Sequence, residues 1–264
     1  MSSPLVSVAI ATVSRHKYLR RAISSVLLDT SYPNVEVVVY AGDPPRPTIK
    51  VLEEMAQSDN ERLRFIVGPR GPPPVQFNRA IAESRGEYIC RLSDDDFLPA
   101  ESIRHRVEVL NADPSLTAVC GILQAAESDF GTHPPIDDTH VCLSELWNRN
   151  YVSLCSYLVR RRPDYIFRED LKLAEDMEML FRLSSIATVK WIPKVVYIHD
   201  CLSSSRLGMA DAQANKRETD TVLQMYKECR CHCGKLPSDG QALPPITGWF
   251  VRKATWVHQP QDIA

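Results

Sequence analysis

In the first 125 residues, short apolar runs alternate with longer amphipathic segments, and this alternation limits the folds open to the chain. The apolar runs predict strands at residues 5–11, 35–40, 63–67, 88–92 and 117–123. The segments between them predict helices, the first of which follows a Ser14 N-cap. Strands that alternate with helices form a parallel sheet with helices on both faces. We therefore expect an α/β fold in which ligands bind outside the carboxyl ends of the strands.

The sequence after residue 125 is less regular. It predicts a polar loop at 126–150, a strand at 151–159, a helix at 174–186, two short strands at 189–192 and 195–199 separated by a turn at Pro193, a polar helix at 211–228, and a tail containing proline and glycine. We expect no internal repeat and no low-complexity segment.

Composition and charge exclude several classes of protein. A hydrophobic fraction of 44% and a charged fraction of 24% are globular values, which excludes a disordered, collagenous or coiled-coil chain. Lys plus Arg total 31 against 33 Asp plus Glu, a balance that argues against a nucleic acid partner. No apolar run approaches the roughly 18 residues of a membrane span, and the N-terminus lacks the basic region of a signal peptide. We expect a soluble cytoplasmic protein without a transmembrane segment, and leave peripheral membrane contact open.

The cysteines are distributed as reduced thiols. Five of the eight occur singly, mostly within apolar runs, which is typical of buried free cysteines and not of a disulfide scaffold. Cys229, Cys231 and Cys233 are closer together and flank His232. Because a C-x-C-x-C run lacks the second half of a zinc site, we favour incidental thiols and keep zinc as the alternative.

The acidic triplet Asp94-Asp-Asp96 directly follows the predicted strand at 88–92. Such triplets are usually solvated turns or helix caps, but this one closes a strand at the edge where ligands bind. Adjacent carboxylates repel one another and call for a positive charge. Mn²⁺ or Mg²⁺ takes one or two carboxylates and completes its coordination with water and phosphate oxygens. Neither a P-loop nor a G-x-G-x-x-G fingerprint occurs in the sequence, so we expect a diphosphate bridged by metal.

Several short blocks occur in an order that resembles the family 2 glycosyltransferases of the GT-A fold. They are Thr12-Val-Ser-Arg15, Gly42-Asp43, Asn78-Arg-Ala-Ile-Ala82 with Gly86-Glu-Tyr88, Leu92-Ser-Asp-Asp-Asp-Phe-Leu-Pro99, residues 167–182 and residues 196–199. The resemblance covers roughly residues 5–206 and implies a GT-A, Rossmann-like, mostly parallel sheet flanked by helices, with a less regular acceptor-side part. It implies a nucleotide-sugar (donor) half at 1–125, an acceptor and catalytic-base half of the same domain at 126–210, and a C-terminal helix and tail at 211–264.

The resemblance also implies which residues bind the donor. These are Thr12 and Ser14, near the base and ribose; Asp43, which accepts a hydrogen bond from a pyrimidine N–H; Arg70, which contacts base or phosphate; Asn78; and Asp94, beside the ribose. At Asp43 the chain departs from the family, which commonly has two consecutive aspartates directly after the strand.

The metal ligands and the catalytic base are implied in the same way. Either Asp95 or Asp96 is the direct ligand of Mn²⁺ or Mg²⁺, and His199 is a further candidate with a structural role as its alternative. Glu175 and Asp176 alone would indicate only acidic residues in the first turn of a helix. The resemblance implies that Asp176 is the base that deprotonates the attacking hydroxyl, in a single displacement that inverts the anomeric centre.

The expected function is inverting transfer of a sugar from a nucleotide-diphosphate donor, a UDP-sugar, to a sugar or other hydroxyl-bearing acceptor. One alternative is a nucleotidyltransferase, which should carry a Gly-rich basic loop after the first strand; residues 12–16 are not such a loop. The other is an inactive glycosyltransferase-like binding subunit, against which the intact Asp94–Asp96 triplet and Asp176 argue.

Overall fold

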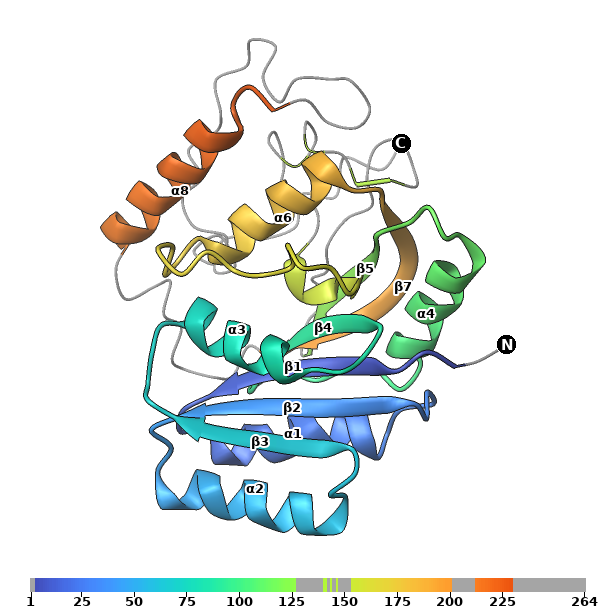
Figure 1. Ribbon diagram of the computed structural model, residues 1–264, viewed down its shortest axis with the longest axis vertical. Helices are drawn as coiled ribbons and strands as arrows, with labels where there is room; N and C mark the ends of the chain where they lie inside the picture. Colours follow the sequence, from blue (N-terminus) through green and yellow to red (C-terminus); the bar gives the residue numbers. More distant parts are fainter. Residues whose placement is uncertain are drawn as a thin grey trace.

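Among the described residues of the computed structural model, seven strands form one sheet (Figure 1). The structure describes residues 3–126, 153–200 and 212–229, together with His140, Val141, Leu143 and Leu146. The strands are β1 (Val6–Thr12), β2 (Val35–Gly42), β3 (Leu63–Gly68), β4 (Tyr88–Ser93), β5 (Ala118–Ala125), β6 (Leu158–Arg160) and β7 (Val189–His199). Their order is β3-β2-β1-β4-β6-β5-β7, and every pairing is parallel except those that β6 makes. The mostly parallel α/β sheet expected from the sequence is confirmed.

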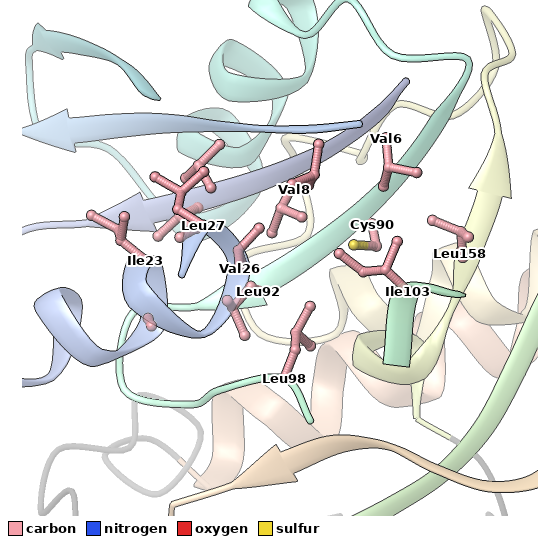
Figure 2. Packing of buried hydrophobic residues seen from close by; sticks show 14 of the residues in the cluster. Val6, Val8, Ile23, Val26, Leu27, Cys90, Leu92, Leu98, Ile103 and Leu158 are labelled. Carbon is pink, nitrogen blue, oxygen red and sulfur yellow. The ribbon is translucent and has the colours of Figure 1, made fainter. Parts of the chain in front are cut away.

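Helices cover both faces of the sheet because alternate residues of each strand are apolar on opposite faces. One face is packed by α1 (His16–Leu27), α2 (Arg46–Ser58) and α4 (Ser102–Ala112), and the other by α3 (Pro73–Glu83) and α6 (Glu175–Ile186). In β1, Val8 and Ile10 belong to the hydrophobic cluster on the face covered by α1, α2 and α4, and Ala9 belongs to the cluster on the face covered by α3 and α6. Figure 2 shows part of the cluster on the α1 face, where side chains of β1, α1, β4 and α4 pack together. A further helix, α8 (Ala212–Tyr226), lies against α6.

Two helices begin at residues that the sequence patterns do not indicate. The N-cap of α1 is Arg15, no side chain caps this helix, and Ser14 is exposed, so the predicted Ser14 N-cap is wrong. Helix α2 begins at Arg46, directly before a proline. Pro47 is tolerated there because the first turn of a helix needs no N–H donor.

The strands of the second half also differ from the prediction. Within the predicted strand at 151–159, residues 151 and 152 are not among the described residues, residues 154–156 form a short 3₁₀ turn, η1 (Leu154–Ser156), and strand β6 begins only at Leu158. The two strands predicted on either side of Pro193 are one continuous strand, β7. Its pairing with β5 shifts register between Gly121 and Ile122, which pair with Ile192 and Val195. Pro193 lies in this irregularity, where the ladder does not require the N–H that proline lacks.

Gly121 at this irregularity provides a test of the β5–β7 packing. A Cβ there would lie 2.7 Å from the carbonyl oxygen of Lys194 and 3.0 Å from Cγ1 of Val196, so the backbone would have to move. We expect Gly121→Ala to lower the free energy of unfolding by about 1–3 kcal/mol. Gly71→Ala is the matched control, because the nearest atom to its Cβ would be Cγ1 of Val75 at 3.4 Å. Denaturant unfolding of both variants measures the difference, and equal stability would contradict the close approach.

Candidate functional site

Three consecutive aspartates follow β4, and all three are buried, with exposed fractions of 6%, 7% and 2% for Asp94, Asp95 and Asp96. The end of β4 meets two other strand ends. Strand β1 lies beside it in the sheet, and Phe97 exchanges two backbone hydrogen bonds with Ile198 of β7. The sequence therefore brings the triplet to the expected carboxyl edge of the sheet, between β1 and β7.

The carboxylate of Asp96 is bonded to the end of β7. Its Oδ2 accepts a hydrogen bond from the Tyr197 hydroxyl at 2.6 Å, and its Oδ1 accepts from the backbone N–H of Asp200 at 2.9 Å. The same Oδ1 lies 2.9 Å from Nδ1 of His199. Burial and the negative charge of Asp96 raise the pKa of Tyr197 well above its ordinary value, so its hydroxyl remains a donor. Asp96 thus joins β4 to β7 through three donors.

Asp94 and Asp95 are joined by the guanidinium of Arg15. One nitrogen, Nη1, lies 3.0 Å from Oδ1 of Asp94 and 2.7 Å from Oδ2 of Asp95. Thr12, at the end of β1, donates a hydrogen bond to the other oxygen of Asp94 at 2.6 Å. Burial raises the pKa of Asp94 to about 6, against the opposite effects of the Thr12 hydrogen bond and the Arg15 charge. Two carboxylates thus converge on one positively charged position.

A second arginine of α1 supports the same turn. Nη2 of Arg21 donates to the backbone carbonyl of Asp95 at 2.7 Å and to Oδ2 of Asp200 at 2.6 Å. Its guanidinium carbon lies 4.6 Å from the centroid of the Phe97 ring. Sequence reasoning does not identify Arg15, Arg21 or Tyr197 as site residues. The two arginines could have been suspected from the sequence, because the acidic triplet needs positive charge and the first predicted helix is rich in basic residues.

Asp43 lies where β2 ends, at the same edge of the sheet. It is exposed and adopts a left-handed backbone conformation, with a φ of 44°. Its Oδ2 accepts from the backbone N–H of Arg70 at 2.9 Å, and its own N–H donates to the carbonyl of Gly68 at 2.8 Å. These bonds tie the loop after β2 to the loop after β3 and fix the direction of the Asp43 carboxylate. Arg70 is itself exposed in the second loop.

The amide of Asn78 is bonded within the protein. Its Nδ2 donates to the carbonyl of Phe167 at 2.9 Å and to Oε1 of Glu169 at 3.1 Å, and its Oδ1 accepts from the N–H of Phe167 at 2.8 Å. Asn78 therefore fastens α3 to the segment that leads into α6. A direct contact between Asn78 and the donor stays a prediction.

Glu175 and Asp176 form the first turn of α6 in different surroundings. Asp176 is partly exposed; its Oδ1 accepts from the N–H of Met177 at 2.8 Å, and its Oδ2 has no hydrogen-bond partner among the described residues. Glu175 is buried, with Oε1 3.6 Å from Nη1 of Arg91. Burial, followed by the negative charge of Asp176, raises the pKa of Glu175 to about 8. At neutral pH, therefore, Glu175 is mainly protonated.

The Arg91 guanidinium provides a positive charge next to the first turn of α6. It projects from β4 toward two aromatic rings, and its central carbon lies 4.4 Å from the centroid of Phe77 and 5.5 Å from that of Phe167. Because Arg91 stands three residues before Asp94 on the chain, its approach to Glu175 brings α6 to the same end of β4 as the acidic triplet.

Other sequence expectations fall partly outside the described residues. Cys231, His232 and Cys233 are among the residues not described, so the zinc alternative is untested. Cys90 and Cys120 are buried free thiols, and burial raises the pKa of both. Within the described ranges, no three His, Cys, Asp or Glu side chains are grouped so that they could hold a metal ion by themselves. The helices of the same ranges are all too short or too polar to cross a membrane.

Comparisons with known proteins agree with this arrangement. A sequence model of the family described as Glycosyl transferase family 2 matches residues 7–167. An uncharacterised glycosyltransferase of Rickettsia felis is 28% identical over 198 residues, which are 70% of this chain and 32% of that protein. The chain thus spans about a third of the length of that relative.

Two solved structures show the same fold. Residues 1–349 of TarS from S. aureus, in complex with UDP-GlcNAc, superpose with a TM-score of 0.72 at 17% identity, covering 85% of this chain and 67% of that one. The mannosyltransferase PcManGT from Pyrobaculum calidifontis, in complex with GDP-Man and Mn²⁺, gives a TM-score of 0.62 at 16% identity, covering 94% and 68%. The predicted GT-A fold is confirmed.

The raised pKa of Glu175 predicts how stability depends on pH. An unfolded Glu loses its proton near its ordinary pKa of 4.5, whereas folded Glu175 keeps it to about pH 8. Wild-type stability should therefore fall as pH rises through this window, because the native state binds the extra proton. Glu175→Gln resembles the protonated acid permanently, so its melting temperature relative to wild type should increase from pH 5 to pH 8. A difference that is constant with pH would show that Glu175 titrates normally.

Proposed function

The chain belongs to glycosyl transferase family 2, and on that premise we propose that it is an inverting glycosyltransferase that moves a sugar from a nucleotide-diphosphate donor to a hydroxyl group. One observation carries the proposal. The Arg91–Glu175 approach brings the first turn of α6, which contains Asp176, to the end of β4, where the acidic triplet lies. A site for a charged donor and a carboxylate base for an acceptor therefore share one edge of the sheet.

The proposed donor is a UDP-sugar. The exposed Asp43 carboxylate is held by the backbone of Arg70 and can only accept hydrogen bonds, which suits the N–H of a uracil ring. Thr12, Ser14, Arg70 and Asp94 lie in or beside the loops at the same strand ends, where ribose and phosphates would follow the base. TarS binds UDP-GlcNAc and PcManGT binds GDP-Man, so a nucleotide-sugar at this edge is consistent with both neighbours.

A divalent cation suits the two carboxylates that Arg15 joins. We propose Asp95 as a direct ligand, because three donors already occupy the oxygens of Asp96. Mn²⁺ or Mg²⁺ needs one or two protein carboxylates when phosphate oxygens complete its shell. His199 is a further proposed ligand, because its imidazole lies beside Asp96 at the end of β7 and imidazole nitrogens bind such ions. When bound, the ion would stabilise the charge on the departing diphosphate.

Asp176 is the proposed general base. The N–H of Met177 holds its Oδ1, so that Oδ2 is available to take the proton of the acceptor hydroxyl. The hydroxyl oxygen attacks the anomeric carbon opposite the diphosphate, which leaves with its bonding electron pair. The configuration of the sugar is thereby inverted.

The metal assignment is tested by comparing two neighbouring aspartates. Asp95→Ala should abolish the Mn²⁺-dependent part of UDP binding without lowering the melting temperature, because it removes one of two adjacent carboxylates. Asp96→Ala should lower the melting temperature, because it leaves buried donors of Tyr197 and Asp200 unpaired. Thermal-shift titrations of UDP with and without Mn²⁺ measure both effects. Wild-type binding of UDP and Mn²⁺ by Asp95→Ala would refute Asp95 as a ligand.

The base is tested with Asp176→Asn, which keeps an oxygen for the Met177 N–H but cannot take a proton at neutral pH. Release of UDP in the presence of acceptor should fall by about 10²–10⁴-fold, while the affinity for UDP should barely change. Asp170→Asn is the control, since Asp170 is an exposed carboxylate of the same segment, paired with Arg168. A folded Asp176→Asn variant with unchanged turnover would remove the base from the proposal.

A further inference from the structure

Helix α6 carries the proposed base but has no side-chain cap of its own. Its N-cap residue is Ala174, whose side chain cannot accept a hydrogen bond. Backbone N–H groups at the start of a helix have no partner within the helix, and a buried one must find an acceptor elsewhere. Ala174 is buried, so the entry into α6 depends on a group from another part of the chain.

Glu218 of α8 supplies that acceptor. Its Oε2 accepts hydrogen bonds from two successive backbone N–H groups, those of Leu173 at 2.8 Å and Ala174 at 3.1 Å. A carboxylate on backbone N–H groups makes short, charge-assisted bonds, and two of them fix both the position and the direction of the peptide segment. That segment ends two residues before Asp176.

Helix α8 is itself fastened to α6, so Glu218 is held in a defined place. Glu218, Val222 and Tyr226 are spaced four residues apart and share one face of α8. Val222 and Tyr226 are buried, and the Tyr226 hydroxyl donates to Oε1 of Glu178 at 2.8 Å. The Tyr226 ring meets the ring of Phe181 edge-on, with centroids 5.8 Å apart. Figure 1 shows α8 beside α6, on the side away from β1, β2 and β3.

We propose that Glu218 is a positioning residue for the transfer reaction: by holding the N–H groups of Leu173 and Ala174, it sets the place from which Asp176 meets the acceptor hydroxyl. The proposal rests on the assignment of Asp176 as the base. It makes α8 part of the acceptor side of the site, although none of its residues needs to touch donor or acceptor. A misplacement of the base by about 1 Å is enough to slow such a reaction about 10²-fold.

Glu218 also contributes charge, and this contribution must be separated from its hydrogen bonds. After burial and Asp176, its negative charge adds to the raised pKa of Glu175. Glu218→Gln removes the charge but keeps an amide oxygen that can accept from both N–H groups. Glu218→Asp keeps the charge but withdraws the carboxylate by one methylene. Glu218→Ala removes both.

Steady-state kinetics below the melting temperature of each variant test the proposal. We expect Glu218→Ala to lower kcat about 10–100-fold with KM for the donor and affinity for UDP unchanged. Glu218→Asp should also lower kcat, and it tests the proposal if Glu218→Ala does not fold. Glu218→Gln should retain the wild-type kcat within a few-fold. Asp220→Ala, which removes an exposed carboxylate paired with Lys216 on the same helix, should behave as wild type.

Amide hydrogen exchange provides a readout that does not depend on turnover. The amides of Leu173 and Ala174 should exchange faster in Glu218→Ala and Glu218→Asp, and at the wild-type rate in Glu218→Gln and Asp220→Ala. Faster exchange together with wild-type kcat would refute the positioning role, as would equal losses of kcat and donor affinity. Wild-type turnover in Asp176→Asn would refute both the base and the positioning role. This failure can be told from a failure of the positioning role alone, because the exchange pattern of the Glu218 variants would still be as expected.

Discussion

The buried carboxylate of Asp96 holds together the two strand ends on which the candidate site depends. Strand β6 pairs only with the first residues of β4, so that among the described residues the carboxyl end of β4 has no sheet neighbour on that side. The bonds from Tyr197, His199 and Asp200 to Asp96, and the two backbone bonds between Phe97 and Ile198, take the place of a ladder there. This connection between β4 and β7 also fixes the position of Asp94 and Asp95, because they lie between the end of β4 and Asp96.

Charges around the site are balanced by side chains from different layers of the fold. Arg15, which precedes α1 as its N-cap, and Arg21 of α1 reach the acidic turn from one face of the sheet. From β4 itself, Arg91 reaches Glu175 on the other face. Each of these buried carboxylates thus has a cation, a proton or several hydrogen-bond donors, which is the usual condition for burying acids at a site. Asp176 differs from the buried acids, since it is partly exposed and has one oxygen without a hydrogen bond among the described residues.

The sequence predicts the strands and helices that depend on local periodicity, and it does not predict features that depend on contacts between distant segments. Continuous apolar runs predict β1 to β5, and the position of the triplet after β4 predicts the edge at which it lies. The Ser14 cap and the break at Pro193 fail because tertiary contacts, a guanidinium bridge in one case and a shifted register in the other, outweigh local preference. Glu218 could not be recognised, because its partners are backbone N–H groups 44 and 45 residues away that leave no mark on the sequence. Donor, metal and acceptor contacts remain predictions.

The guanidinium of Arg15 has a consequence for how fast the proposed donor would reach this edge of the sheet. A nucleotide-sugar diphosphate is an anion, and three bare aspartates would repel it over several ångströms before any contact formed. Arg15 pairs with Asp94 and Asp95, and Arg21 pairs with Asp200, so the two guanidinium groups offset part of this negative charge. The repulsion that the proposed donor would meet is thereby weakened, and salt should screen what remains of it.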